Sequence, residues 1–142
     1  MRGIGEPALA LTLPAQPSAF DDGLLTASEV AQLQLDADWV VLSACNTAAG
    51  DRPEAEALSG LARAFFYAGA RSLLVSHWAV ASDAAVKLTS ATFAHLRSAP
   101  EISRAEALRR AMLEFMTDPS SPTNAYPAFW GPFAIIGGEA AD

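Results

Sequence analysis

Two short runs of mostly apolar residues constrain the fold of this chain more than any other feature. Trp39–Leu42 and Ser72–Val75 have the length of strands, and such runs are typical of strands buried on both faces of a parallel sheet. Gly69 is placed to end a helix between them, and that helix is indicated by apolar residues at the spacing of one helix face, Leu58, Leu61, Ala62 and Phe65. Alternating strands and helices predict an α/β fold with a mainly parallel sheet, in which the two strands are neighbours.

Further segments extend this pattern toward both ends of the chain. Ala8–Leu13 and Phe133–Ile136 have strand character. Val30 and Leu33 are expected on one face of the helix that precedes Trp39. Helix starts are predicted at two Ser/Thr-x-x-Glu capping boxes and at one serine: Thr26–Glu29, Ser103–Glu106 and Ser82.

Composition excludes several classes of function. The chain has 142 residues, 51% of them hydrophobic, and a net charge of −7. An acidic surface repels phosphate backbones, so no nucleic-acid partner is expected, and no apolar run approaches the ~20 residues that cross a bilayer. One cysteine and two histidines without clustered carboxylates predict no metal site. We expect a cytoplasmic protein without a cofactor or a membrane partner.

Cys45 is the residue best placed to act as a nucleophile. It follows the first strand, within Ser43–Thr47, and small residues come after it. A thiol attacks only as the thiolate, which requires a nearby histidine or a helix N-terminus. The alternative is a buried structural cysteine, because free cysteine is among the most buried residue types.

His77 is the local candidate for the base that would activate this thiol. It follows the second strand and precedes Trp78. The alternative is a histidine on the rim of a pocket, held beside that tryptophan. His95 lies late in a helix, where a surface histidine is ordinary.

The stretch Trp39–Thr47 resembles the CHAT domains, which are caspase-like domains often found after TPR repeats and related to caspases and separase. The likeness continues through Ala57–Trp78 to Phe129–Phe133, and it includes the run-up to the cysteine, Gly5–Leu11 and Asp22–Glu29. The resemblance implies a caspase-like three-layer sandwich over residues 1–139, with residues 140–142 as a tail.

The resemblance also implies a role for Cys45 as the nucleophile of a peptidase. In the family a histidine on an earlier strand, typically in a His-Gly pair, takes the thiol proton. In caspases this histidine lies roughly 50 residues before the cysteine, and no histidine precedes Cys45 here. We therefore expect that the strand or strands with this histidine are missing from the chain, and that the chain alone is inactive.

The family's substrate pocket implies a set of rim residues, namely Asn46, His77, Trp78, Ser82 and Asp83. Related sequences often carry an aspartate three or four residues past the tryptophan, and in separase one such aspartate receives a basic substrate side chain. Those positions are Ala81 and Ser82 in this chain, so a preference for Arg or Lys before the cleaved bond is not predicted.

Three hypotheses follow from these residues. The first is a cysteine peptidase domain, or a part of one, that acts on a protein or peptide substrate. The second is a non-catalytic interaction module with the same fold, and the third is a different hydrolase with a local Cys45–His77 pair. A TPR region upstream is a further partner to expect, and so is a second copy of the chain, paired through an uncovered sheet edge at Ala8–Leu13 or at a neighbouring strand.

Overall fold

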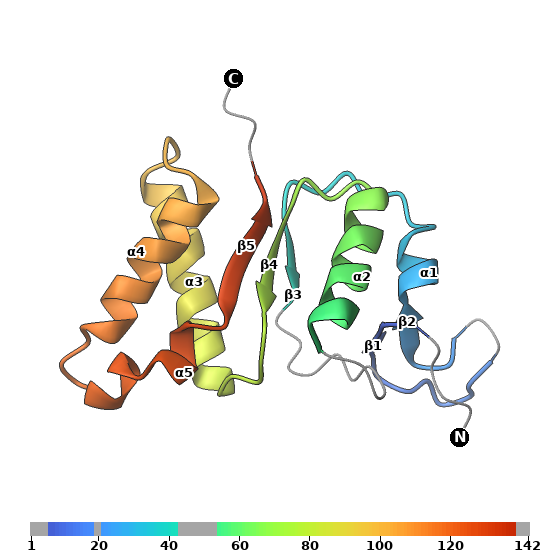
Figure 1. Cartoon of the computed structure of the whole chain (residues 1–142), viewed down its shortest axis with the longest axis horizontal. Coiled ribbons are helices and arrows are strands. Elements are labelled where there is room, and N and C mark those ends of the chain that lie inside the picture. Colours follow the sequence, from blue (N-terminus) through green and yellow to red (C-terminus); the bar gives the residue numbers. More distant parts are fainter. Residues whose placement is uncertain (1–5, 19–20, 43–53, 139–142) are drawn as a thin grey trace. The chain divides into compact units, whose positions relative to one another are not determined.

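The computed structural model describes residues 6–18, 21–42 and 54–138. They form two compact units. The first comprises residues 6–18, 21–40 and 54–71, and the second comprises residues 41–42 and 72–138. Figure 1 shows the order of the helices and strands along the chain.

The first unit contains a small antiparallel sheet and two helices. Strand β1 (Ala8–Ala10) pairs with β2 (Leu24–Thr26). Helices α1 (Ala27–Val30) and α2 (Glu54–Tyr67) pack against each other. The predicted strand at Ala8–Leu13 is confirmed, although it is shorter than expected. In the part of the chain that the structure describes, β2 is its one neighbour.

The capping box at the start of α1 is confirmed. The Thr26 hydroxyl accepts a hydrogen bond from the Glu29 N–H at 3.3 Å, and the Glu29 carboxylate accepts one from the Thr26 N–H at 2.8 Å. Val30 is buried, as expected. The prediction that Leu33 shares its helix face is wrong, because α1 ends at Val30 and Leu33 lies beyond it, 40% exposed.

The end of α2 confirms the prediction for Gly69. The Gly69 N–H donates to the Phe66 carbonyl and the Ala70 N–H donates to the Phe65 carbonyl, each at 3.0 Å. This is the hydrogen-bond pattern of a Schellman motif, in which the residue after the helix adopts a left-handed conformation. Gly69 has φ +101°, and a Cβ at this position would overlap the carbonyl oxygen of Leu35. Only glycine meets both requirements.

Arg71 joins the chain after this corner to the segment between α1 and β3. Its guanidinium donates to the Asp36 carboxylate at 2.6 Å and to the Asp38 carboxylate at 2.8 Å. The hydrogen bond to Asp36 is the main cause that raises the pKa of Arg71. The Arg71 N–H also donates to the Ala37 carbonyl at 2.9 Å. All three charged side chains are exposed, so these bonds fix geometry more than they add stability.

The second unit is built on a mixed sheet in the order β3-β4-β5. Strands β3 (Val40–Leu42) and β4 (Ser72–Ser76) run in the same direction, and β5 (Phe133–Gly137) runs against β4 (Figure 1). The α/β class and the pairing of β3 with β4 are confirmed, but the prediction of a mainly parallel sheet is wrong for the described strands, because one sheet is antiparallel and the other is mixed. Ser72 to Val75 are buried, as predicted. The prediction that β3 is buried on both faces is wrong, since its residues are half-buried, consistent with its place at the end of the described strand order.

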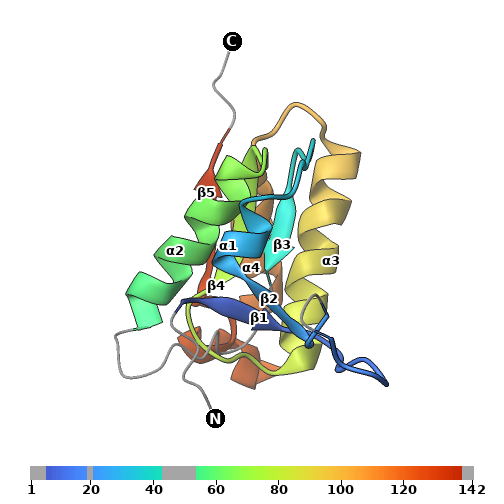
Figure 2. The same cartoon turned by 90° about the vertical axis from the view of Figure 1, so that its right-hand side faces the viewer.

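Two antiparallel helices, α3 (Ser82–Ser98) and α4 (Arg104–Met116), lie together on one side of β4 and β5 (Figures 1 and 2). A 3₁₀ turn, η1 (Pro122–Ala125), and a short helix, α5 (Pro127–Trp130), lead from α4 to β5. The buried residues of these helices form much of the core of this unit: Ala84, Leu88 and Thr92 of α3, and Ala107, Leu108, Ala111 and Phe115 of α4.

The two predicted helix starts in this unit have different outcomes. Ser103 is the N-cap of α4, and its hydroxyl accepts a hydrogen bond from the Glu106 N–H at 3.1 Å. The Glu106 carboxylate binds Arg109 and Arg110, which lowers its pKa to about 2, so half of the capping box forms. The prediction that Ser82 caps α3 is wrong. The N-cap position is Ala81, whose carbonyl already accepts from the Ala85 N–H, and Ser82 is the first helical residue.

Candidate functional site

The candidate site lies where β4 ends. Parallel strands have their carboxyl ends at the same edge of a sheet, and open α/β sheets carry their sites at that edge. Cys45 and Asn46, which follow β3 in the sequence, lie outside the described residues, so their predicted roles stay predictions. The carboxyl end of β4 is described, and His77 and Trp78 follow it directly.

His77 extends the β4–β5 ladder by one hydrogen bond. Its backbone N–H donates to the carbonyl of Pro132 at 3.0 Å, one step beyond the paired residues Ser76 and Phe133. The residue is exposed. The prediction that His77 stands at the end of the strand is confirmed, and its backbone is fixed while its imidazole is open to solvent.

Trp78 is held by α5. Its indole N–H donates to the Ala128 carbonyl at 3.2 Å. The side chain is nevertheless 46% exposed. An indole that is bound at its polar end and open over much of its ring presents a fixed apolar surface, as tryptophans at binding sites often do.

The connection from Trp78 to α3 carries the other two predicted rim residues. Val80 is its buried residue, whereas Ser82 and Asp83 are exposed. Asp83 lies in the first turn of α3, where a carboxylate interacts favourably with the positive end of the helix dipole. The four described rim residues therefore lie within residues 77–83 and are exposed, and Asp83 also has a structural role.

Some residues that shape this end of the sheet were missed by the sequence reasoning. The Ala128 carbonyl accepts a hydrogen bond from Trp78, and the Pro132 carbonyl accepts one from His77. Both carbonyls reach this end of the sheet only because the chain returns to it before the antiparallel strand β5. Within the described part of the chain, the buried hydroxyl of Ser76 and the indole N–H of Trp130 have no hydrogen-bond partner. The Phe129–Phe133 stretch of the family resemblance was the one signal that pointed to this region.

The described residues contain neither a cluster of metal ligands nor a helix that could span a membrane. Among them, no group of three or more His, Cys, Asp or Glu side chains is arranged to hold a metal ion. None of the described helices combines the length and the apolar character that crossing a membrane requires.

The fold and the site thus define a mixed α/β domain with its candidate site at the ends of parallel strands. The chain belongs to the CHAT domain family, which its sequence matches over residues 4–138. It is similar to Tetratricopeptide repeat protein 28 of Mus musculus and of Homo sapiens, with 34% identity over 116 residues in each case. The alignment covers 82% of this chain and 4% of each relative, so the chain spans a small part of the curated relatives that it matches. No solved structure shows a significant match.

Proposed function

We propose that this chain is the cysteine-bearing part of a caspase-like peptidase domain, with a caspase-like sandwich fold and Cys45 as the nucleophile. One observation carries the proposal. The Ser43–Thr47 block directly follows β3, and β3 runs parallel to β4 (Figure 1). A nucleophile after a buried or half-buried strand has a rigid support behind it and open space in front of it.

The proposed chemistry is acyl transfer through a thiolate. The sulfur of Cys45 attacks the carbonyl carbon of the scissile peptide, the C–N bond breaks, and the leaving amine takes a proton. Water then hydrolyses the thioester and frees the thiol. Both steps need a group that accepts and returns the proton, because a free thiol with a pKa of about 8.5 is mostly protonated at neutral pH.

The chain alone is expected to hydrolyse peptides very slowly. No histidine precedes Cys45 in its sequence, whereas the family resemblance places the base on an earlier strand. In a serine peptidase, loss of a member of the catalytic triad costs roughly 10⁴- to 10⁶-fold in rate. Five rim residues are proposed to border the substrate: Asn46, His77, Trp78, Ser82 and Asp83. The fixed, half-exposed ring of Trp78 supports such a role.

Rescue by added imidazole tests this proposal. The chain is incubated with a pool of fluorogenic peptides at neutral pH, with and without imidazole, beside Cys45→Ala. We expect little cleavage by the chain alone and an imidazole-dependent increase that Cys45→Ala abolishes. Equal rates in the two proteins at every imidazole concentration would contradict the proposal, provided that circular dichroism shows both to be folded.

The alternative is a non-catalytic interaction module. The similarity to a tetratricopeptide repeat protein favours it, since such a setting offers TPR repeats as partners. Under this alternative imidazole has no effect, and Cys45→Ala binds its partners as the unaltered chain does. Self-association through the uncovered side of β1 stays a prediction under either function.

A further inference from the structure

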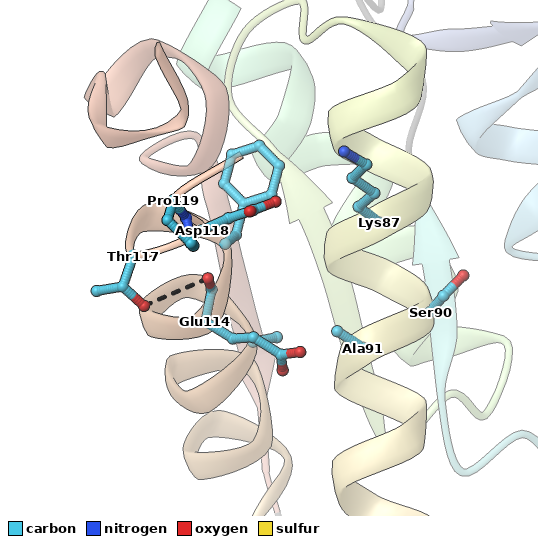
Figure 3. A pocket seen from close by; sticks show the side chains of 9 residues that line it. Lys87, Ser90, Ala91, Glu114, Thr117, Asp118 and Pro119 are labelled. Atoms are coloured by element: carbon cyan, nitrogen blue, oxygen red, sulfur yellow. Dashed lines mark hydrogen bonds between the residues drawn. The ribbon is translucent and has the colours of Figure 1, made fainter. Parts of the chain in front are cut away.

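A cleft of about 600 Å³ lies between α3 and α4, away from the residues that the sequence singles out (Figure 3). Its volume falls within the roughly 300–1,000 Å³ of ordinary ligand sites. The cleft lies wholly in the second unit, and both of its walls are described helices.

The floor of the cleft is apolar. Its apolar lining residues include Ala91 of α3 and Ala111 and Phe115 of α4. Ala111 is 1% exposed and Phe115 is 7% exposed, so both belong to the packed core and hold the floor in place. A floor of this kind suits the methylene stem of a long side chain, which buries its carbons while its charged end stays near water.

The α4 wall is negatively charged. Figure 3 shows the Glu114 carboxylate directed toward α3 near Ala91, and the Asp118 carboxylate directed toward Lys87. The last turn of α4 contains no basic residue, and the C-terminal end of a helix carries a partial negative charge. Hydrogen bonds from the Ser120 hydroxyl and N–H lower the pKa of Asp118, so this carboxylate, ionised at neutral pH in any case, stays ionised further into the acid range.

The positive groups near these carboxylates do not balance this charge. Lys87 on α3 supplies one ammonium group, and it attracts Asp118 only through space. The imidazole of His95 lies 3.1 Å from the Glu114 carboxylate and is charged only when protonated. Among the described residues that line the cleft, two carboxylates and a helix C-terminus therefore face one permanent cation, so the cleft favours a positively charged guest.

We propose that this cleft binds an arginine side chain of a protein partner. The stem would lie on the floor formed by Ala91, Ala111 and Phe115, and the guanidinium would lie between Glu114 and Asp118. A planar guanidinium presents five N–H donors and can serve two carboxylates at once, which an ammonium does less well. A protein partner is favoured over a free polyamine because a side chain whose stem packs on the apolar floor also brings the surrounding surface of its protein into contact.

Titration of the ¹⁵N-labelled 142-residue chain with a short peptide that contains a single arginine tests this proposal. The matched probe carries citrulline, which keeps the shape and removes the charge. We expect amide shifts confined to residues around the cleft, weak binding of the arginine peptide, and at least tenfold weaker binding of the citrulline peptide. Equal affinity for the two peptides would overturn the proposal.

Charge variants give a sharper test because their expected effects on the affinity for the arginine peptide have opposite signs. Glu114→Gln and Asp118→Asn should each weaken binding about threefold, as expected for a partly exposed charge pair, and Lys87→Gln should tighten it by a similar factor. Glu101→Gln removes the same charge from the exposed turn before α4 and should change the affinity little. Weaker binding by Lys87→Gln would overturn the proposal, and so would an equal loss in Glu101→Gln.

A titration with a polyamine distinguishes the two possible sources of the bound cation, a protein side chain and a free polyamine. Spermidine is titrated under the same conditions, and we expect it to bind more weakly than the arginine peptide. Tighter binding of spermidine at the same amides would overturn the assignment to a protein partner. Thermal unfolding of each variant, followed by circular dichroism, shows whether the helices are intact.

Discussion

The two ends of β4 are constrained in different ways. Before the strand, Gly69 closes a helix in a left-handed conformation, and Arg71 is bound by its backbone and by two carboxylates. After the strand, His77 and Trp78 are exposed, and each donates a hydrogen bond to a backbone carbonyl. The constrained end fixes the path of the chain, whereas the open end carries exposed side chains, and binding residues are often found on such connections between the elements of a rigid scaffold.

Gly69→Ala should break the constrained end and have the largest effect. The new side chain would be held at positive φ and would overlap the Leu35 carbonyl. A left-handed conformation costs about 1–2 kcal/mol for a non-glycine residue, and overpacking costs about as much again. We expect the free energy of unfolding to fall by about 3 kcal/mol, measured by urea denaturation.

Gly138→Ala is the matched control for this substitution. A Cβ at Gly138 would meet nothing within 4 Å, and its φ is not in the left-handed region. The free energy of unfolding should stay nearly unchanged. If both variants lose the same stability, the left-handed corner is not what distinguishes Gly69.

Trp78→Phe should have a smaller effect at the open end. It removes the indole N–H that donates to the Ala128 carbonyl and leaves an aromatic ring in place. A neutral hydrogen bond contributes about 0.5–1.5 kcal/mol to stability. Because the Trp78 side chain is half-exposed, we expect the free energy of unfolding to fall by an amount near the lower of these values. Tyr126→Phe removes a hydroxyl from a residue that is 70% exposed and should cost less. A larger loss in Tyr126→Phe than in Trp78→Phe would show that the indole bond contributes little.

His77→Ala should have the smallest effect, on both stability and thiol chemistry. The backbone N–H that donates to Pro132 remains, and the lost imidazole is exposed. We expect the pH dependence of Cys45 alkylation to be the same in this variant and in the unaltered chain. A thiol that reacts well below pH 8 and loses this reactivity in His77→Ala would instead establish a local Cys45–His77 pair.

Local signals in the sequence predicted much of the fold. The capping box at Thr26, the helix end at Gly69 and the buried strand at Ser72–Val75 each depend on neighbouring residues, so short-range patterns were sufficient. The length of β1 depends on where its pairing with β2 ends, and the exposure of Leu33 depends on where α1 ends. No short pattern contains that information.

The direction of β5 was accessible to the sequence but was not drawn from it. A crossover between parallel strands returns the chain to the starting edge, as one helix does. Here two antiparallel helices, α3 and α4, separate β4 from β5, so the chain arrives back at the edge where β4 ended. The second strand must then run antiparallel, as it does. The same return brings Ala128 and Pro132 to the candidate site.

Pro132 determines where the sheet stops. Two residues that face each other in a hydrogen-bonded pair of an antiparallel ladder normally exchange two bonds. Proline has no N–H, so Pro132 can accept from His77 but cannot donate in return, and the last rung is one-sided. The side chain of Pro132 is among the most completely buried in the described chain, which holds this rung in place. The missing N–H of Pro132, directly before β5, thus limits the length of β4. It also limits the position at which the chain leaves the sheet toward the proposed rim residues.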